Sequence, residues 1–335
     1  MRVAVLLFGQ PRFFEYTVNR IKEEFNIPNH KFEYFIHFWE DVGFTPNDDR
    51  NRKYITSNTL LEDINILNPI AFNINKYDVL DEFTINFNNI IQFLNKGQIG
   101  GHRPYDTKSR YSYGQHLSLK IAYSLMQEYE KKNKIKYDTV IKARTDFIYK
   151  DIKCYDEECE YISDKTNQYI LDKNLGDNYI KASGCAQQAF DVSTNTWNIV
   201  EKYKIFDPKS TKYKRDLYNI IRSGDVGLTT TRIAAEQYFN RWFDTFLHTY
   251  INDIRNNVNN PELQLYRRHD GLQGQIAILN DIKIVQPKKS RDHRIVLKDN
   301  CKEKWIKPKT IILDNLNNPE KDITEQLLSK HQKKL

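Results

Sequence analysis

The stretch "VAVLLFGQPRFFE", residues Val3–Glu15, decides how the start of the chain folds. Its first six residues are all apolar, which is typical of a strand that is covered on both faces in a parallel sheet. The apolar run stops at Gly9, and the loop Gln10–Arg12 follows it. A glycine at a strand end lets backbone N–H groups approach a ligand closely, and Arg12 has the charge to neutralise a phosphate. The alternative is that Gly9 and Pro11 only shape a turn.

Outward from this strand, short apolar runs alternate with helical patterns. In the first half we expect strands over Arg2–Phe8, Phe32–Trp39, Asn68–Tyr77 and Thr139–Ala143, helices over Phe13–Glu24 and Tyr113–Lys134, and a loop over Gly97–Arg110. In the second half we expect strands over Cys185–Val192 and Asp281–Pro287, a helix capped by Ser193 that carries Trp197, and a long helix over Thr230–Tyr250. This alternation predicts an α/β fold with a mostly parallel central sheet flanked by helices.

The composition limits the classes of protein that fit. The 335-residue chain is 39% apolar, which is enough for a sizeable core. Lys and Arg exceed Asp and Glu by 51 to 44, a dispersed excess that permits a phosphate-bearing ligand but is too small for a dedicated nucleic-acid binder. The four cysteines form neither a CxxC pair nor a zinc spacing, so we expect free thiols in a reducing compartment.

Neither a signal peptide nor a segment able to span a bilayer is recognisable in the sequence. We therefore expect a cytoplasmic protein, and docking on a membrane surface stays open. Neither internal repeats nor a low-complexity linker divides the chain. We expect a single domain over residues 1–300 and a peripheral C-terminal extension over residues 301–335.

The segment "KARTDF" follows the predicted strand Thr139–Ala143 and places polar side chains where that strand ends. In an open α/β sheet, ligands bind outside the carboxyl ends of the strands. A carboxylate at such a place, here Asp146, is able to hold a divalent cation that bridges a diphosphate. The alternative is that Arg144 and Asp146 form an ordinary surface ion pair.

The order "VAVLLFGQPRFFE", "FEYFIHFWED", a long helix containing "SLKIAYSL", and "YDTVIKARTDFIY" resembles the nucleotide-sugar-dependent glycosyltransferases of the GT-A type. The resemblance is to the bacterial and large-virus group with a G-Q-x-R strand loop and an R-x-D element, and it covers roughly residues 1–250. It implies a GT-A-like, Rossmann-type sheet. It also implies a donor half over about residues 1–150 and an acceptor half over about residues 151–300.

Carried onto this sequence, the resemblance implies that Gly9, Gln10 and Arg12 contact the nucleotide side of the donor. Asp146 matches the second acid of the D-x-D element, which holds Mn²⁺ or Mg²⁺ in the family. The first acid is replaced by Arg144. This departure leaves the need for metal open, because an arginine at this place is itself able to neutralise the diphosphate.

The second half is expected to supply the acceptor site and, in an inverting enzyme, a carboxylate that takes the proton of the acceptor hydroxyl. The candidates are Asp191, Asp225 and Glu236. Asp191 lies where the strand meets the predicted helix, and the alternative is that it caps that helix. For Glu236 the alternative is an ordinary glutamate on a helix surface.

The basic segment "KKSRDHR", Lys288–Arg294, follows the late strand. The resemblance implies a C-terminal loop that closes the donor site, in which His293 binds the metal while Arg291 and Arg294 bind the diphosphate. The alternative is a solvated basic loop. His37 alternates with apolar residues in the second strand, and we expect it to be a hydrogen-bonded core residue rather than a ligand.

The leading hypothesis is a glycosyltransferase that moves a sugar from a nucleotide diphosphate sugar, with a UDP-sugar favoured, to a glycan, a lipid-linked sugar or another hydroxyl acceptor. It has no role for nucleic acid. One alternative is a non-catalytic basic module that binds nucleic acid or anionic glycan. Another is a sugar nucleotidyltransferase, which normally carries a glycine-rich phosphate loop, whereas "GQPRFFE" has one glycine.

Overall fold

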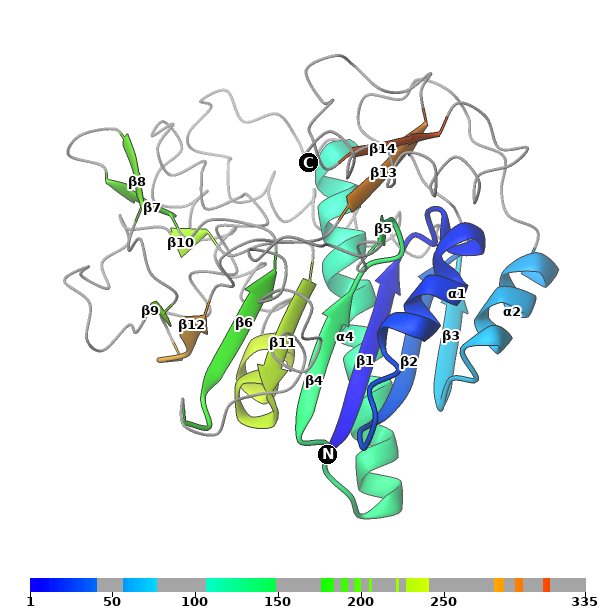
Figure 1. Ribbon diagram of the computed structural model, residues 1–335, viewed down its shortest axis with the longest axis horizontal. Coiled ribbons are helices and arrows are strands. Elements are labelled where there is room, and N and C mark those ends of the chain that lie inside the picture. The colour runs from blue at the N-terminus through cyan, green and yellow to red at the C-terminus, as the bar shows by residue number, and fades with distance from the viewer. Residues whose placement is uncertain are drawn as a thin grey trace, which may run out of the picture.

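The computed structural model in Figure 1 describes twelve segments of the chain. They are residues 1–40, 57–76, 107–148, 176–183, 188–191, 196–199, 205–206, 221–222, 227–240, 280–285, 293–297 and 310–313. Asp225 and Arg291 lie outside the described residues, as do most of the predicted loop Gly97–Arg110 and the part of the predicted helix from residue 241 to Tyr250. Among the helices described, none has both the length and the apolar character to cross a bilayer.

A single mixed sheet forms the centre of the molecule. Its strand order is β3 (Ala71–Asn75), β2 (Lys31–Trp39), β1 (Arg2–Gly9), β4 (Thr139–Ala143), β11 (Gly227–Thr231), β6 (Tyr179–Ser183), β12 (Lys283–Val285) and β9 (Ile205–Phe206). The first four strands are parallel, β11 runs antiparallel to both β4 and β6, and β12 runs with β6 and against β9. The predicted α/β fold with a mostly parallel sheet is confirmed.

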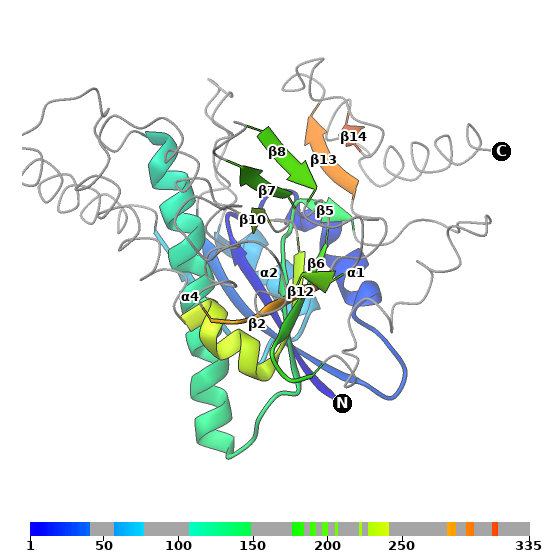
Figure 2. The ribbon, with the colours of Figure 1, turned by 90° about the vertical axis from the view of Figure 1, so that its left-hand side faces the viewer.

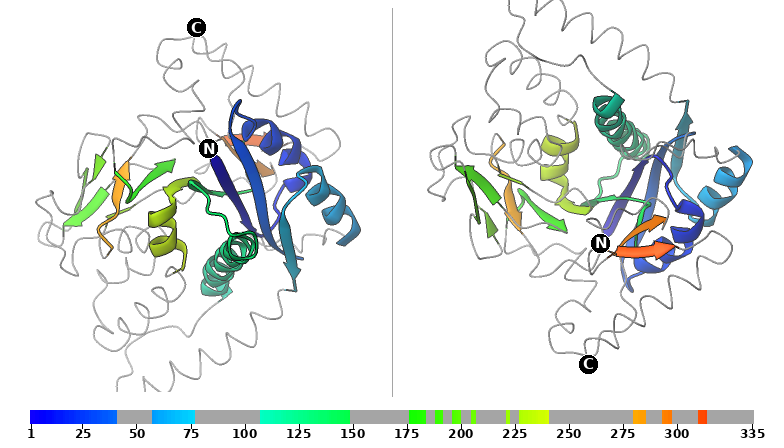
Figure 3. Two further views of the ribbon diagram at one scale, coloured as in Figure 1. Left: turned by 90° about the horizontal axis from the view of Figure 1, so that it is seen from below. Right: turned by 90° about the horizontal axis from the view of Figure 1, so that it is seen from above.

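Helices cover both faces of the parallel strands (Figure 3). On one face, α1 (Phe14–Glu24) and α2 (Ser57–Ile66) pack on alternate residues of the sheet, including Val5, Leu7 and Ile36. The other face is covered by α4 (Thr107–Asn133). Because both faces are buried, β1 is apolar from Val3 to Phe8, as the sequence indicated, and in β2 even the polar residues Glu33 and His37 are buried.

Alpha helix α4 is joined to β2 by polar as well as apolar contacts. The indole Nε1 of Trp39 donates a hydrogen bond of 3.1 Å to the carbonyl oxygen of Gly114. The ring centroids of Phe35 and Tyr129 lie 5.8 Å apart. These contacts hold the helix against the strands that end at the carboxyl edge of the sheet.

Several predicted elements differ from the structure. The predicted helix after Ser193 is wrong, because residues Thr196–Ile199 form strand β8, which pairs antiparallel with β7 (Gln188–Asp191). A short apolar pattern does not separate a strand from a helix, and Thr196 and Trp197 both favour strands. Helix α2 was not predicted, and α4 begins at Thr107, before the predicted Tyr113.

Strand β11 was also missed. The helix predicted from Thr230 begins only at residue 232, and the three threonines Thr229–Thr231 belong to the strand. Branching at Cβ suits threonine to the pleated sheet. Thr231 then begins the helix over residues 232–240, because its Oγ1 accepts a hydrogen bond of 3.1 Å from the N–H of Ala234.

Two small sheets lie beyond the carboxyl edge of the parallel strands (Figures 1 and 2). One contains β10 (Ile221–Arg222), β7 and β8, and the other contains β14 (Thr310–Leu313), β13 (His293–Leu297) and β5 (Phe147–Ile148). Strand β14 belongs to the segment predicted as a peripheral extension from residue 301. Its parallel pairing with β13 joins residues 310–313 to the sheet that includes β5.

Candidate functional site

The order of the strands points to one place on the sheet. From β1 the chain adds β2 and then β3 on one side, and it returns to the other side of β1 to add β4. The direction of strand addition therefore reverses between β1 and β4. In open α/β sheets, ligands bind outside the carboxyl ends of the strands at such a reversal. The segments that follow β1 and β4 are the two that the sequence singled out.

The segment after β1 forms a tight turn that is held at both ends. Gly9 has a φ of 95°, a backbone conformation that favours glycine, and its N–H donates to Ser118 Oγ at 2.6 Å. The N–H of Arg12 donates to the carbonyl oxygen of Gln10 at 2.8 Å, and the Arg12 Nη2 donates to Gln10 Oε1 at 2.6 Å. Gly9 and Pro11 thus form the turn that was considered as their alternative role, and this turn also positions the guanidinium of Arg12.

Phe13 directly after this turn has strained backbone geometry. Its φ of 56° is left-handed, which is uncommon for a bulky residue. The side chain is buried, and the Phe13 carbonyl oxygen accepts the N–H groups of Tyr16 and Thr17 at the start of α1. The burial of the side chain and the hydrogen bonds that begin α1 stabilise Phe13 in this strained conformation. Backbone strain of this kind is often found at ligand sites.

The segment after β4 carries a bidentate ion pair. Arg144 Nε and Nη2 donate to the two carboxylate oxygens of Asp146, both at 2.8 Å. Arg144 and Asp146 therefore form the ion pair expected as the alternative, but it is largely buried, since the Asp146 side chain is only 6% exposed and that of Arg144 is 18% exposed. Lys142 does not join the site, because it is fully buried in β4 with its Nζ 5.6 Å from the ring centroid of Phe8.

Hydrogen bonds join the two segments. Thr145 Oγ1 donates to the carbonyl oxygen of Gln10 at 3.3 Å, and Thr17 Oγ1 of α1 donates to the carbonyl oxygen of Thr145 at 2.8 Å. The structure therefore brings the loop of Gly9, Gln10 and Arg12 together with the loop of Arg144 and Asp146. Thr17 and Thr145 were not singled out from the sequence, since a hydroxyl that braces a loop has no sequence pattern of its own.

His37 and Ser118 support the site from behind. The ring Nδ1 of His37 lies 2.6 Å from Ser118 Oγ, its Nε2 lies 2.9 Å from Asn75 Oδ1, and the side chain is fully buried. Burial lowers the pKa of His37 to about 4, with the hydrogen bond to Asn75 opposing that shift, so the ring is neutral near pH 7. The prediction of a hydrogen-bonded core histidine is confirmed. Its partner Ser118 in turn holds the N–H of Gly9.

The C-terminal strand β13 is placed beside the loop after β4. It pairs antiparallel with β5, so that His293 is opposite Ile148 and Arg294 is opposite Phe147. Phe147 directly follows Asp146 in the chain. Of the predicted C-terminal loop Lys288–Arg294, the two described residues His293 and Arg294 belong to a strand, and their backbone lies beside the candidate site from about 150 residues away in the sequence.

Asp191 is the last residue of β7 and pairs with Thr196 of β8, so it lies at the end of a pair of strands and not before a helix. Beta strand β7 lies beyond the carboxyl edge of the main sheet, on the same side as β5 and β13 (Figures 1 and 2). The strand that ends at Asp191 thus lies on the carboxyl-edge side of the main sheet, as the candidate site does.

Glu236 lies at the opposite edge of the sheet. The helix over residues 232–240 follows β11, which ends at Thr231 opposite Thr139, the first residue of β4. Beta strand β4 has five residues, so Asp146 and the start of this helix are separated by the length of the strand, roughly 13 Å or more. The structure does not bring Glu236 together with Asp146.

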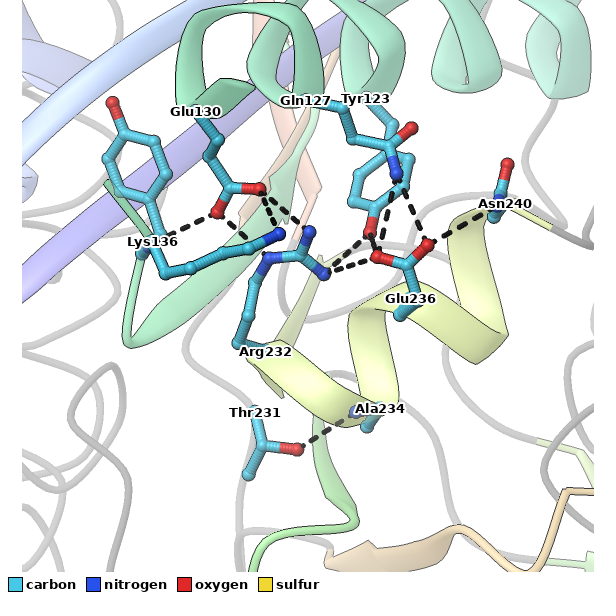
Figure 4. A network of polar contacts seen from close by, with 10 residues as sticks. Tyr123, Gln127, Glu130, Lys136, Thr231, Arg232, Ala234, Glu236 and Asn240 are labelled. Carbon is cyan, nitrogen blue, oxygen red and sulfur yellow. Dashed lines mark hydrogen bonds and ion pairs between the residues drawn. The ribbon is translucent and has the colours of Figure 1, made fainter. Parts of the chain in front are cut away.

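The carboxylate of Glu236 takes part in a network between α4 and the helix over residues 232–240 (Figure 4). It accepts hydrogen bonds from Arg232 Nη1 at 2.8 Å and from the Tyr123 hydroxyl at 3.1 Å. Arg232 also donates to both carboxylate oxygens of Glu130, at 2.9 and 2.7 Å. Burial would raise the pKa of Glu236, but the hydrogen bonds and charge of Arg232 lower it below its ordinary value. A general base is usually poised nearer to neutral pH, so this environment suits a structural role.

The residues present fit a divalent cation poorly. Both oxygens of Asp146 accept hydrogen bonds from a guanidinium, whose positive charge opposes a second cation beside it. Mg²⁺ and Mn²⁺ favour sites rich in oxygen ligands. Within the described residues there is no group of three or more histidines, cysteines or acids that is able to hold a metal ion.

Neither the known family models nor the curated proteins include a match to this chain. Solved structures that resemble it include a nucleoside-diphosphate-sugar pyrophosphorylase from Vibrio cholerae RC9, with a TM-score of 0.30 and 12% identity over 88% of this chain and 95% of that one. They also include LgtC, described as a galactosyltransferase in complex with donor and acceptor sugar analogues, with a TM-score of 0.34 and 10% identity over 98% and 96% of the two chains. An active-site mutant of LgtC has a TM-score of 0.35 and 10% identity over 97% and 83%.

Proposed function

We propose that this protein is a glycosyltransferase with a GT-A-like fold, which transfers a sugar from a nucleotide diphosphate sugar to a hydroxyl acceptor. The observation that carries the proposal is the contact between the two loops at the switch point. There Thr145 joins the G-Q-x-R loop after β1 to the R-x-D loop after β4. Such a place suits a nucleotide ligand, and two arginines in it suit the phosphates.

The reaction would be a substitution at the anomeric carbon of the donor. The acceptor oxygen forms a bond to this carbon, the bond from this carbon to the diphosphate oxygen breaks, and the diphosphate leaves with the electron pair. The acceptor proton passes to a base. In an inverting enzyme, we assign this role to Asp191, because β7 lies on the ligand side of the sheet. Glu236 is not included, because its carboxylate is bound to Arg232 at the other edge.

Arg12 would contact the nucleotide side of the donor, with Gly9 and Gln10 forming the turn that presents it. Arg144 would lie beside the diphosphate. His293 and Arg294 are the first residues of β13, whose pairing with β5 supports their contribution to the donor site, and we also assign Arg291, two residues before β13 in the sequence, to that site. A UDP-sugar is the favoured donor, and a glycan or a lipid-linked sugar is the favoured acceptor.

The test is a panel of nucleotide sugars, each assayed with and without Mn²⁺ for a rise in melting temperature and for turnover. The proposal expects one donor class to raise the melting temperature and to release a nucleoside diphosphate when acceptor glycans are added. Release of pyrophosphate from a nucleoside triphosphate and a sugar phosphate would instead indicate a nucleotidyltransferase. Salt-sensitive binding of polyanions with no response to any nucleotide sugar would indicate the non-catalytic module.

A further inference from the structure

We propose that the site between the loops after β1 and β4 binds the diphosphate of the donor through guanidinium groups and without a divalent cation. In this arrangement Asp146 is a positioning residue that holds Arg144, and not a metal ligand. The inference rests on the proposed function and specifies how that same site recognises its substrate. It replaces the metal role that the D-x-D resemblance implies for Asp146.

The first argument is the geometry of the pair. A guanidinium presents its N–H groups as a rigid fork, and here the side of the fork formed by Nε and Nη2 meets both oxygens of Asp146 at 2.8 Å. A cation bound to Asp146 would have to share these oxygens with Arg144 or displace it. Displacement would separate Arg144, whose side chain is only 18% exposed, from the carboxylate of Asp146, and separating a largely buried ion pair is costly.

The second argument is exposure. The Asp146 side chain is 6% exposed and the Arg144 side chain is 18% exposed. Of the two side chains, that of Arg144 is therefore the more accessible one. A buried carboxylate behind an arginine fixes the orientation of the guanidinium, so that less side-chain entropy is lost when the anion binds.

The third argument is the balance of charge. The described loop residues 9–12 and 144–146 contain the two arginines Arg12 and Arg144 and the single carboxylate of Asp146, for a net charge of +1. Thr145 holds the two loops together through its bond to Gln10. A positive site of this kind attracts a diphosphate and repels a dication.

The same geometry meets the need of the reaction. When the bond between the anomeric carbon and the diphosphate breaks, the electron pair stays on the diphosphate oxygen and its negative charge increases. Arg144 would stabilise this charge by a charge-assisted hydrogen bond, with no proton transferred. A guanidinium that is already oriented by Asp146 does not need to reorganise at that moment.

The experiment is titration calorimetry of the full chain with UDP, GDP, ADP, CDP and dTDP, each in excess EDTA and again in excess MnCl₂. We expect the nucleoside diphosphate that binds to do so with a Kd that differs by less than about twofold between the two conditions. Binding that occurs only with Mn²⁺ would overturn the inference while leaving the proposed function intact. A folded protein that binds none of the five under either condition would overturn both.

Variants separate the two roles of Asp146. In EDTA, Arg144→Gln is expected to weaken binding by about tenfold or more, and Arg144→Lys to restore only part of the loss. Asp146→Asn keeps an oxygen for Arg144 and removes a negative charge, so its Kd is expected to stay within about threefold of wild type or to become tighter. If Asp146 is a metal ligand, Asp146→Asn instead loses binding in MnCl₂.

The matched control is Lys31→Gln, which removes one positive charge at the start of β2, at the opposite edge of the sheet. Its side chain is 62% exposed, and the variant is expected to bind like wild type. Thermal unfolding of every variant identifies any that fails to fold. The comparison of EDTA with MnCl₂ in wild type tests the inference without any substitution.

Discussion

Two arginine–carboxylate groups lie at opposite edges of the same sheet, and they differ in what they connect. Arg232 joins α4 to the helix over residues 232–240 through Glu130 and Glu236 (Figure 4). Arg144 binds Asp146, two residues further along the same loop. Bonds between distant elements stabilise the tertiary fold, whereas a pair within one loop chiefly determines how that loop presents its charge. The same chemistry therefore serves structure at one edge and, we propose, recognition at the other.

The largest effect is expected when the ion pairs of Arg232 with Glu130 and Glu236 are disrupted. Arg232→Met is expected to lower the free energy of unfolding by about 3 kcal/mol, because Glu130, only 2% exposed, loses its main counter-charge. Burial raises the pKa of Glu130, but its bonds to Arg232 and to the N–H of Tyr137 lower it overall, so this carboxylate stays charged. Urea denaturation measures the loss. Nucleoside diphosphate affinity of the folded variant is expected to stay within about twofold of wild type.

The control for this variant is Lys136→Met. Lys136 pairs with the same carboxylate of Glu130, but its side chain is 71% exposed. We expect a loss below about 1 kcal/mol. If Arg232→Met kept its stability and lost ligand binding, the roles assigned to the two edges would be reversed.

The second prediction concerns His37, which supports the loop after β1 at the carboxyl edge of the sheet. Burial holds the pKa of His37 at about 4, whereas an unfolded histidine has a pKa of about 6.5. The folded state therefore binds fewer protons, and this contribution to stability is fully present above about pH 6.5 and lost as the pH falls to about 4. The difference between these two pKa values corresponds to a contribution of about 3 kcal/mol to the free energy of unfolding.

Chemical denaturation between pH 7 and pH 4 measures this slope in wild type and in His37→Gln. The variant is expected to have a shallower pH dependence, because glutamine does not titrate. Since His37 holds Ser118 and Ser118 holds Gly9, the variant is also expected to weaken nucleotide binding at pH 7. An unchanged slope would contradict the neutral buried state of His37.

The third prediction concerns Arg12, in the loop after β1. Arg12→Gln is expected to weaken nucleoside diphosphate binding by about tenfold through the loss of one charge-assisted hydrogen bond. Its free energy of unfolding is expected to change by less than about 1 kcal/mol. Calorimetry and urea denaturation measure the two quantities. Lys22→Gln, in the last turn of α1, is the control and should alter neither. Normal affinity in Arg12→Gln would remove Arg12 from the donor site.

The smallest effect is expected for Glu236→Gln. The Glu236 side chain is 47% exposed and pairs with Arg232 four residues earlier in the same helix, so stability should fall by about 0.5 kcal/mol. Turnover, measured as release of nucleoside diphosphate, is expected to be unchanged. Asp191→Asn is the contrasting variant, with a loss of about 100-fold or more if Asp191 is the base. Loss of turnover in Glu236→Gln would restore it as a catalytic candidate.

The parallel half of the fold was predictable from local patterns. Beta strand β4 matches its predicted bounds, and β1, β2 and α1 lie within one residue of theirs. The clearest case is β1, which is a continuous apolar run because it is buried on both faces. Beta strand β11 was not predictable in this way. Its sequence GLTTT has few apolar residues, and it becomes a buried strand only because β4 and β6 offer hydrogen bonds on both sides.

The sequence alone determined which loops end the strands β1 and β4, and with them the residues Gly9, Gln10, Arg12, Arg144 and Asp146. Only the tertiary structure decided which charged residues share a site. In the tertiary structure, Thr145 joins the loops after β1 and β4, and β13 pairs with β5. Glu236 lies at the edge of the sheet where β4 begins, away from these loops. The physical reason is that side-chain character is local, whereas strand order and direction depend on pairing between segments far apart in the chain.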